Sequence, residues 1–195
     1  MISIFKNVKK SWKKILKKYV NDKDILNLYK NKIVFPKINN IFETFKYFEL
    51  EETKLVFIGQ DPYINFKMID NKIIPQATGL SFSVPDNFII PPSLKNIFIE
   101  IKNSYPNYII PDNGNLIRWV KKEKILLLNT SLTVEKSKSN SHQHFWKNIT
   151  DNIIKDISDN HPSTIFLLLG NNAKSKKKFI NEKKHIIIEG IHPSP

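Results

Sequence analysis

Four short apolar runs in the chain are each followed by polar residues whose side chains could do chemistry. The runs cover residues 54–58, 125–128, 165–169 and 186–188. An acid, Asp61, comes soon after the first run, an amide, Asn129, follows the second, and an imidazole, His192, follows the fourth. An acid, an amide and an imidazole that met in one place could bind a polar ligand and stabilise charge during a reaction.

The same runs predict a sheet that would bring these side chains together. Continuous stretches of isoleucine, leucine, valine and phenylalanine, separated by helical segments, are typical of buried parallel strands. The carboxyl ends of such strands share one edge of the sheet, where open α/β folds bind their ligands. We therefore expect an α/β fold with three layers: a central four-stranded, mainly parallel sheet with helices on both faces. No low-complexity linker divides the chain, so residues 1–195 are expected to form a single domain.

Helices are expected around and between the strands, at residues 9–20, 39–48, 93–104 (capped by Ser93), 115–122, 145–158 and 172–181. In residues 9–20, apolar side chains recur at i, i+3, i+4 and i+7, which indicates an amphipathic helix. We interpret its apolar face as docked on the core. An arm that contacts a nucleic-acid backbone and a helix that lies on a membrane surface are the alternatives. Residues 64–78 are expected to be a long connection that forms a surface loop.

The composition points to a polyanionic partner. The formal net charge is +13, and of the 31 basic residues only Arg118 is an arginine. Lysines act as point charges on phosphates, whereas bidentate reading of guanine favours arginine, so we expect DNA binding without sequence preference. The chain has no cysteine, no signal peptide and no apolar run of the roughly 20 residues that span a bilayer. We expect an intracellular monomer, in a prokaryotic cytoplasm, a nucleus or a viral replication site, with no membrane partner and no metal site.

Six short motifs, in this order, resemble those of the family 1 uracil-DNA glycosylases. The family's water-activating motif, G-Q-D-P-Y-H, is matched by residues 59–63 up to its last position. Residues 79–84 resemble the family's G-L-A-F-S-V segment, and residues 91–94 match P-P-S-L. Residues 126–134 match L-L-L-N followed by L-T-V, residues 141–151 resemble the S-H, W and T-D pattern, and residues 192–195 match H-P-S-P. The similarity extends from about residue 35 to the end of the sequence. It implies an enzyme that hydrolyses the N-glycosidic bond of uracil in DNA.

The resemblance also implies how the base would be bound. The enzymes of this family flip the uracil nucleotide out of the DNA and into a pocket. Phe82 would stack on the base, and Asn129 would hydrogen-bond the uracil edge with an amide that both donates and accepts. Tyr63 would fill the space that the methyl group of thymine needs, and Gln60 would add main-chain contacts.

For catalysis, the resemblance implies two residues and no metal or organic cofactor. Asp61, kept ionised, would stabilise the positive charge that develops on the sugar and would position the attacking water. His192 would donate a hydrogen bond to the uracil oxygen on which negative charge develops. Ser93 and Ser194 would bind the phosphates that flank the uracil.

The sequence departs from the family pattern at three places. Ile64 stands where the family has a histidine, and residues 64–78 are longer than the corresponding family segment. The family pattern also continues after the H-P-S-P motif with a leucine-bearing loop that enters the duplex, whereas this sequence stops at Pro195. We therefore expect action on single-stranded DNA to suffer less than action on duplex, and we expect apolar surface to be exposed. The alternative function is a non-catalytic DNA-binding or processivity module that retains the glycosylase fold.

Overall fold

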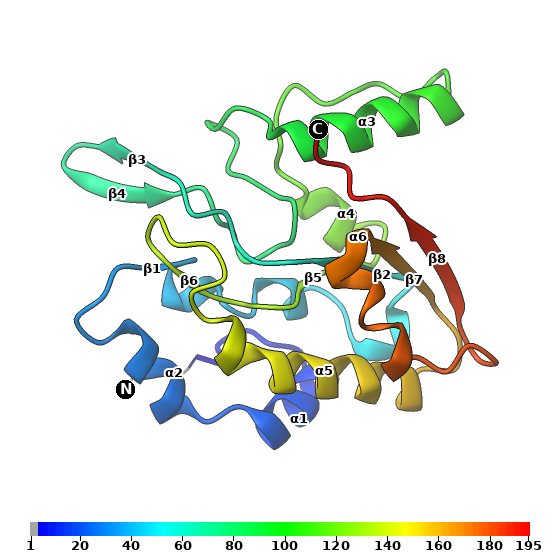
Figure 1. Ribbon diagram of the computed structural model, residues 1–195, viewed down its shortest axis with the longest axis horizontal. Helices are drawn as coiled ribbons and strands as arrows, with labels where there is room; N and C mark the ends of the chain where they lie inside the picture. Colours follow the sequence, from blue (N-terminus) through cyan, green and yellow to red (C-terminus); the bar gives the residue numbers. More distant parts are fainter. Residues whose placement is uncertain (1–3) are drawn as a thin grey trace.

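A four-stranded parallel sheet forms the centre of the computed structural model, which describes residues 4–195 (Figure 1). Its order is β5-β2-β7-β8, and its members are β2 (Leu55–Gly59), β5 (Ile125–Asn129), β7 (Ile165–Leu169) and β8 (Ile186–Gly190). Gly59, at the end of β2, lies opposite Asn129 at the end of β5. The four strands therefore end together, and the predicted α/β fold is confirmed.

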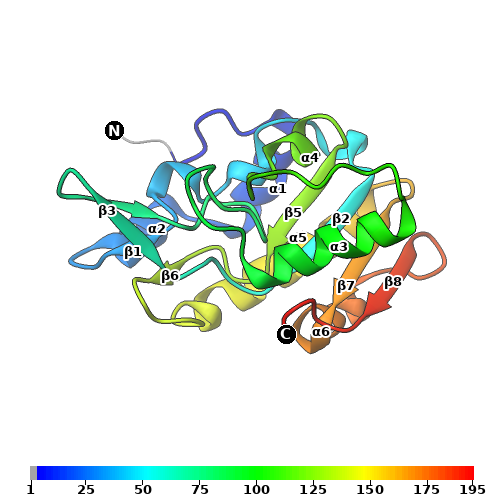
Figure 2. The ribbon, with the colours of Figure 1, turned by 90° about the horizontal axis from the view of Figure 1, so that it is seen from above.

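Helices cover both faces of this sheet, which gives the three layers that the sequence predicts (Figures 1 and 2). The long helix α3 (Pro92–Ser104) and the short α4 (Ile117–Lys121) lie on one face. On the opposite face lie α1 (Lys10–Tyr19) and α5 (Gln143–Asn160). A groove of about 680 Å³ with a mostly apolar lining opens between α3 and the sheet.

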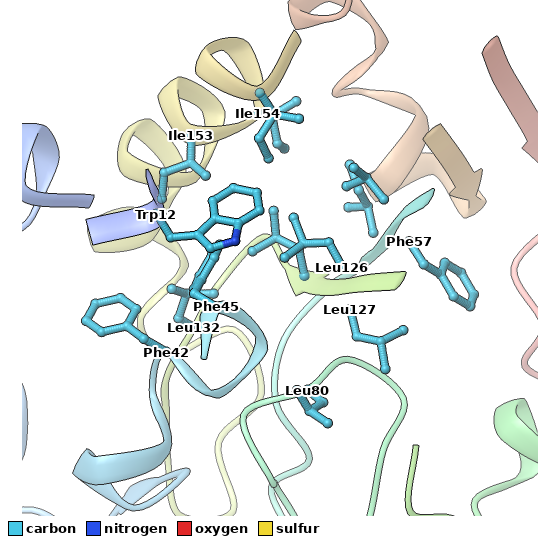
Figure 3. Packing of buried hydrophobic residues seen from close by; sticks show 14 of the residues in the cluster. Trp12, Phe42, Phe45, Phe57, Leu80, Leu126, Leu127, Leu132, Ile153 and Ile154 are labelled. Carbon is cyan, nitrogen blue, oxygen red and sulfur yellow. The ribbon is translucent and has the colours of Figure 1, made fainter. Parts of the chain in front are cut away.

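The core between the sheet and α5 explains the position of the N-terminal helix. Trp12 and Leu16 of α1 are fully buried, and the indole Nε1 of Trp12 donates to the carbonyl oxygen of Phe48 at 2.8 Å. Figure 3 shows Trp12 packed among Phe45 and Leu126. The apolar face of this helix is therefore used inside the protein, which confirms core docking and leaves no such face for a membrane. In the part of the chain described, none of the helices is long and apolar enough to cross a bilayer.

Two of the expected helices are wrong. Residues 39–48 form 3₁₀ turns, η1 (Ile38–Asn40) and η2 (Glu43–Phe45), because Phe42 between them has non-helical angles of φ −105° and ψ 30°. Residues 172–181 are broken into α6 (Gly170–Lys174) and the 3₁₀ turn η4 (Lys177–Phe179). At the break, Lys176 is buried and its ammonium group contacts the carboxylate of Asp151 in α5. This charge pair gives a physical reason for the break.

The segment expected to be a surface loop contains a β-hairpin instead. Strands β3 (Phe66–Ile69) and β4 (Lys72–Pro75) pair in antiparallel register and project from the body of the molecule (Figures 1 and 2). Asp70 and Asn71 join them with φ angles of 48° and 56°, as a two-residue type I′ turn requires. The sequence analysis also missed α2 (Asp22–Tyr29), the 3₁₀ turn η3 (Leu50–Glu52), and the short antiparallel pair of β1 (Val34–Phe35) and β6 (Val134–Glu135).

Candidate active site at the carboxyl edge of the sheet

A pocket of about 260 Å³ opens at the edge where the parallel strands end. The structure brings Asp61, Asn129 and His192 together in its wall, although they are far apart in sequence. Of the eight predicted site residues, all except Ser194 line it. The complete lining is Gly59, Gln60, Asp61, Pro62, Tyr63, Ile64, Phe82, Ser93, Asn129, Ser139 and His192. The roles of these residues stay predictions.

Main-chain hydrogen bonds hold the loop after β2 against the loop after β5. The carbonyl oxygen of Gly59 accepts from the amide of Thr130 at 3.0 Å. The carbonyl oxygen of Gln60 accepts from the amide of Ser131 at 2.9 Å and from the Thr130 hydroxyl at 2.8 Å. These bonds continue the parallel pairing beyond the sheet, so Asp61 and Asn129 start from fixed backbone positions.

The Asp61 carboxylate is held by a loop that sequence reasoning did not connect with it. One oxygen, Oδ2, accepts from the Ser139 hydroxyl and from the Asn140 amide, both at 2.8 Å. Asn140 also accepts a hydrogen bond from Gln60 Nε2 at 2.9 Å. Within residues 4–195 the other oxygen, Oδ1, makes no hydrogen bond, so it is available to a water molecule or a developing cation. Only the position of Ser139 and Asn140 just before the S-H motif could have suggested this role.

Glu135 ties this loop to the rest of the protein. Its carboxylate pairs with the ammonium groups of Lys32 and Lys138, the latter at 3.1 Å. The hydrogen bond from Lys32, and to a lesser extent that from Lys138, lowers the pKa of Glu135 to about 2.

His142 directly follows the same loop. The buried Thr133 hydroxyl is 2.9 Å from His142 Nδ1, and burial lowers the pKa of the His142 imidazole. His142 therefore supports the loop from inside the fold.

Phe82 presents its ring to the pocket from a strained backbone. Its φ angle of 61° lies in the left-handed region, which is costly for a residue with a bulky side chain. Phe57 stacks on it with ring centroids 4.5 Å apart and an interplanar angle of 24°. The Tyr63 hydroxyl lies 3.4 Å from the carbonyl oxygen of Phe82, and burial raises the pKa of this phenol. Strain of this kind is found where function requires one orientation of a side chain.

Asn129 is buried at the floor of the pocket, with 7% of its surface exposed. A Cβ atom on Gly59 would lie only 2.4 Å from Asn129 Oδ1 and 2.8 Å from Ser81 Cβ, so a glycine is needed here. In the described residues the Asn129 side chain makes no hydrogen bond. Its amide donor and acceptor are therefore both available to a ligand.

The imidazole of His192 has a defined orientation. Its Nδ1 accepts from the Ser194 amide at 3.1 Å and lies 2.9 Å from the Ser194 hydroxyl. Because Nδ1 accepts from a backbone amide, the proton of the neutral ring is on Nε2, which can then donate to a ligand. Ser194 thus lies against His192 and not in the pocket lining. Gly170, with φ 84°, makes room for the ring, since a Cβ there would come within 2.8 Å of His192 Cβ.

Ser93 reaches the pocket from the first turn of α3. The helix begins at Pro92 and is preceded by Pro91, so the prediction that Ser93 caps the helix is wrong. Proline is favoured at this position because its missing N–H would have no partner within the helix. The half-buried Ser93 therefore lines the pocket from α3, an element that lies away from the β3–β4 hairpin (Figure 1).

Comparisons with known proteins agree with this arrangement. Residues 45–195 match the family described as the Uracil DNA glycosylase superfamily. The uracil-DNA glycosylase of Francisella tularensis subsp. novicida (strain U112) is 46% identical over 165 residues, which are 84% of this chain and 71% of that protein. The crystal structure of mimivirus uracil-DNA glycosylase superposes with a TM-score of 0.88 at 27% identity, covering 100% of this chain and 72% of that one. The uracil-DNA glycosylase (UNG) structure from Nitratifractor salsuginis has a TM-score of 0.72 at 18% identity, covers 97% of this chain and 86% of that one, and shows the shared fold. This chain belongs to the uracil-DNA glycosylase superfamily.

Proposed function

We propose that this protein is a DNA-repair enzyme that hydrolyses the N-glycosidic bond of uracil in DNA and leaves an abasic site. The single observation that carries the proposal is the meeting of Asp61, Asn129 and His192 around one pocket at the carboxyl edge of the sheet. Membership of the uracil-DNA glycosylase superfamily supports the same reaction.

Base recognition follows from the shape and the free hydrogen-bonding groups of the pocket. A uracil nucleotide flipped out of the DNA would place its base against Phe82, whose ring is held by Phe57. The unpaired amide of Asn129 would donate to one uracil edge atom and accept from its neighbour. With cytosine, a donor of the Asn129 amide would face a donor of the base, or its acceptor would face an acceptor. Each polar group left buried and unpaired costs roughly 1–3 kcal/mol. The Tyr63 ring would occupy the space needed by the methyl group of thymine.

Bond breaking moves an electron pair from the glycosidic bond onto the base nitrogen and leaves a cationic sugar. The Asp61 carboxylate, held through Oδ2, would stabilise that cation and direct a water molecule from Oδ1 to the anomeric carbon. That water adds its oxygen to the sugar and gives its proton to the Asp61 carboxylate, and the departing uracil anion takes up a proton from solvent, so the charges balance. His192 Nε2–H would donate to the uracil oxygen on which negative charge gathers. Donors fixed before the reaction need no reorganisation when the charge develops.

Incubation of the protein with oligonucleotides that contain one uracil, one thymine or one cytosine tests the proposal. Alkali then cleaves the strand wherever an abasic site has formed. We expect cleavage at uracil alone, with single-stranded and duplex substrates compared at equal concentration. DNA binding without any alkali-sensitive site would contradict the enzyme and support the non-catalytic DNA-binding module, which the isoleucine at position 64 favours.

A further inference from the structure

We propose that the β3–β4 hairpin is a DNA-binding arm that holds the strand on the side of the pocket away from α3. The inference rests on the proposed function and extends it to the contacts outside the pocket. The partner is the phosphate backbone of the strand that carries the uracil. The surface concerned is the outer face of the hairpin (Lys67, Ile69, Lys72 and Ile74).

The hairpin begins directly at the rim of the pocket. Ile64 lines the pocket, and its carbonyl oxygen accepts from the amide of Ser137 at 3.2 Å. At the base of the hairpin, the main-chain amide of Gln76 donates a hydrogen bond to the carbonyl oxygen of Asn65 at 2.9 Å. The hairpin and the loop that holds Asp61 are therefore joined at the rim. A strand whose base enters the pocket must pass beside one or both of them.

The hairpin is built as a firm projection. All four residues of β3 pair with β4, from Phe66 opposite Pro75 to Ile69 opposite Lys72. At about 3.3 Å per residue, four paired residues extend roughly 13 Å from the base. The type I′ turn matches the twist of the strands. An arm of this length spans about four nucleotides of a stacked DNA strand, at about 3.4 Å per step, and fewer when the strand is extended.

One face of the hairpin packs against the body of the protein. On the outer face Ile69 and Lys72 are exposed, whereas Lys67 contacts Asn87 and Phe88. Phe66 and Ile73 pack against the small apolar cluster of Phe35, Ala77 and Val134. Because side chains alternate along a strand, the outer face carries the residues between them. Ile69 on that face is 42% exposed. An exposed aliphatic side chain beside lysines suits the sugars and base faces of a DNA strand.

The charge around the hairpin is complementary to phosphate. Lys67 and Lys72 lie on the outer face, and Lys136 stands over the Phe66 ring with its ammonium 4.6 Å from the centroid. Lys67 is oriented by the Phe88 ring, 4.6 Å away, and by the carbonyl oxygen of Asn87. In residues 4–195, Lys72 makes no ion pair. The acids close in sequence to the residues of these contacts include Asp70 at the turn, Asp86 beside Asn87, and Glu135, whose charge Lys32 and Lys138 already balance.

The test compares Lys67→Gln/Lys72→Gln with a control that removes the same charge elsewhere. Lys14→Gln/Lys17→Gln serves as the control, because both lysines are exposed on α1, on the opposite side of the sheet from the hairpin (Figure 1). Neither pair belongs to the proposed catalytic machinery. Three single-stranded substrates are used. One carries extra nucleotides only on the 5′ side of the uracil, one carries them only on the 3′ side, and a minimal substrate carries them on neither side.

For one of the two extended substrates, we expect the hairpin variant to show a several-fold lower kcat/KM and DNA affinity than the wild type. On the minimal substrate the variant should match the wild type. The slope of log affinity against log salt should become less steep by about 1.4, at about 0.7 for each lost phosphate contact on single-stranded DNA. Equal losses in the hairpin and control variants, or no loss in either, would overturn the inference. If the wild type releases no uracil, the proposed function fails, and the arm is still judged by the affinity of the two variants.

Discussion

Asp61 is the residue whose surroundings say most about the chemistry of the pocket. Two donors hold one carboxylate oxygen, the second oxygen makes no hydrogen bond within residues 4–195, and Asp61 lines the cavity. A carboxylate fixed in this way is already oriented before a cation develops beside it, which is the condition under which electrostatic stabilisation contributes most. Ser139 is a positioning residue in this account, because it acts through Asp61.

Ser139→Ala should lower the rate of uracil excision by about tenfold. The variant removes a hydrogen bond to a charged group, worth about 1.5 kcal/mol at the low end of the usual range, while the Asn140 amide remains. Single-turnover kinetics would show the loss in the rate of chemistry, with KM unchanged. Ser139→Thr keeps the hydroxyl and should restore most of the rate. A loss of the same size in both variants would contradict the positioning role.

Gly170→Ala should slow excision by displacing the His192 ring, because the added Cβ would lie within 2.8 Å of His192 Cβ. The same substitution also strains a backbone with φ 84°. A double-mutant cycle separates the two effects. In a His192→Ala background, Gly170→Ala should have no further effect on the excision rate, although the thermal midpoint still falls. An equal loss of rate in both backgrounds would show that the glycine does not act through His192.

The main site residues could be predicted from the sequence because each follows a strand or a motif in a recognisable local context. Asp61, Asn129 and His192 all come just after continuous apolar runs, so the sheet itself implied that they meet. Ser139 could not be predicted in this way. Its contact with Asp61 joins residues 78 positions apart, and nothing local in a Ser- and Lys-rich loop signals that contact.

At the scale of elements, the sheet was predictable and the irregular segments were not. Strands β2 and β5 have apolar runs that are almost completely buried, which is a strong signal. Strands β7 and β8 also have continuous apolar runs, although Ile186 and Ile188 of the edge strand β8 are exposed. Residues 39–48 carry a helix-like spacing of apolar side chains, yet Phe42 and Phe45 reach the core from 3₁₀ turns. Tertiary packing therefore overrode the local pattern. The hairpin has short strands with mixed polarity, and its turn residues, Asp70 and Asn71, are a weaker signal than an Asn-Gly pair.

Trp12→Ala should reduce the free energy of unfolding by about 3–5 kcal/mol. The indole is fully buried between α1 and the core, and its loss also leaves the carbonyl oxygen of Phe48 without its donor. Urea denaturation measures the change. Lys14→Ala, on the exposed side of the same helix, is the matched control and should stay within about 0.5 kcal/mol of the wild type. Similar stability of the two variants would mean that α1 does not complete the core.

At the scale of the whole molecule, the net charge and the fold would serve two different tasks: attraction to DNA and binding of one base. In the proposed function, the sheet and its loops position a small pocket for one base, whereas the net charge of +13 would attract any stretch of DNA. Lysines contact phosphates as point charges, so this attraction carries little sequence preference. In the proposed function, specificity for uracil would therefore come from the pocket.

The affinity for DNA should fall steeply as salt is added, because bound lysines release counterions from the phosphates. A plot of log affinity against log salt for a uracil-free single strand should be linear, with a slope of about −0.7 for each phosphate contact. Oligonucleotides of equal length and different sequence should give the same line. A flat response, or a strong preference for one sequence, would contradict binding led by lysine.

The most direct test of the central claim is the single-turnover release of free uracil from a single-stranded oligonucleotide, quantified by mass spectrometry for the wild type and for Asp61→Asn. Asparagine keeps the size of the side chain and removes its charge. The wild type should release one uracil per strand, and Asp61→Asn should be slower by about 10²-fold or more while binding the DNA equally well. Equal rates in the two proteins, or no uracil from either, would contradict the proposal that Asp61 at this pocket drives excision.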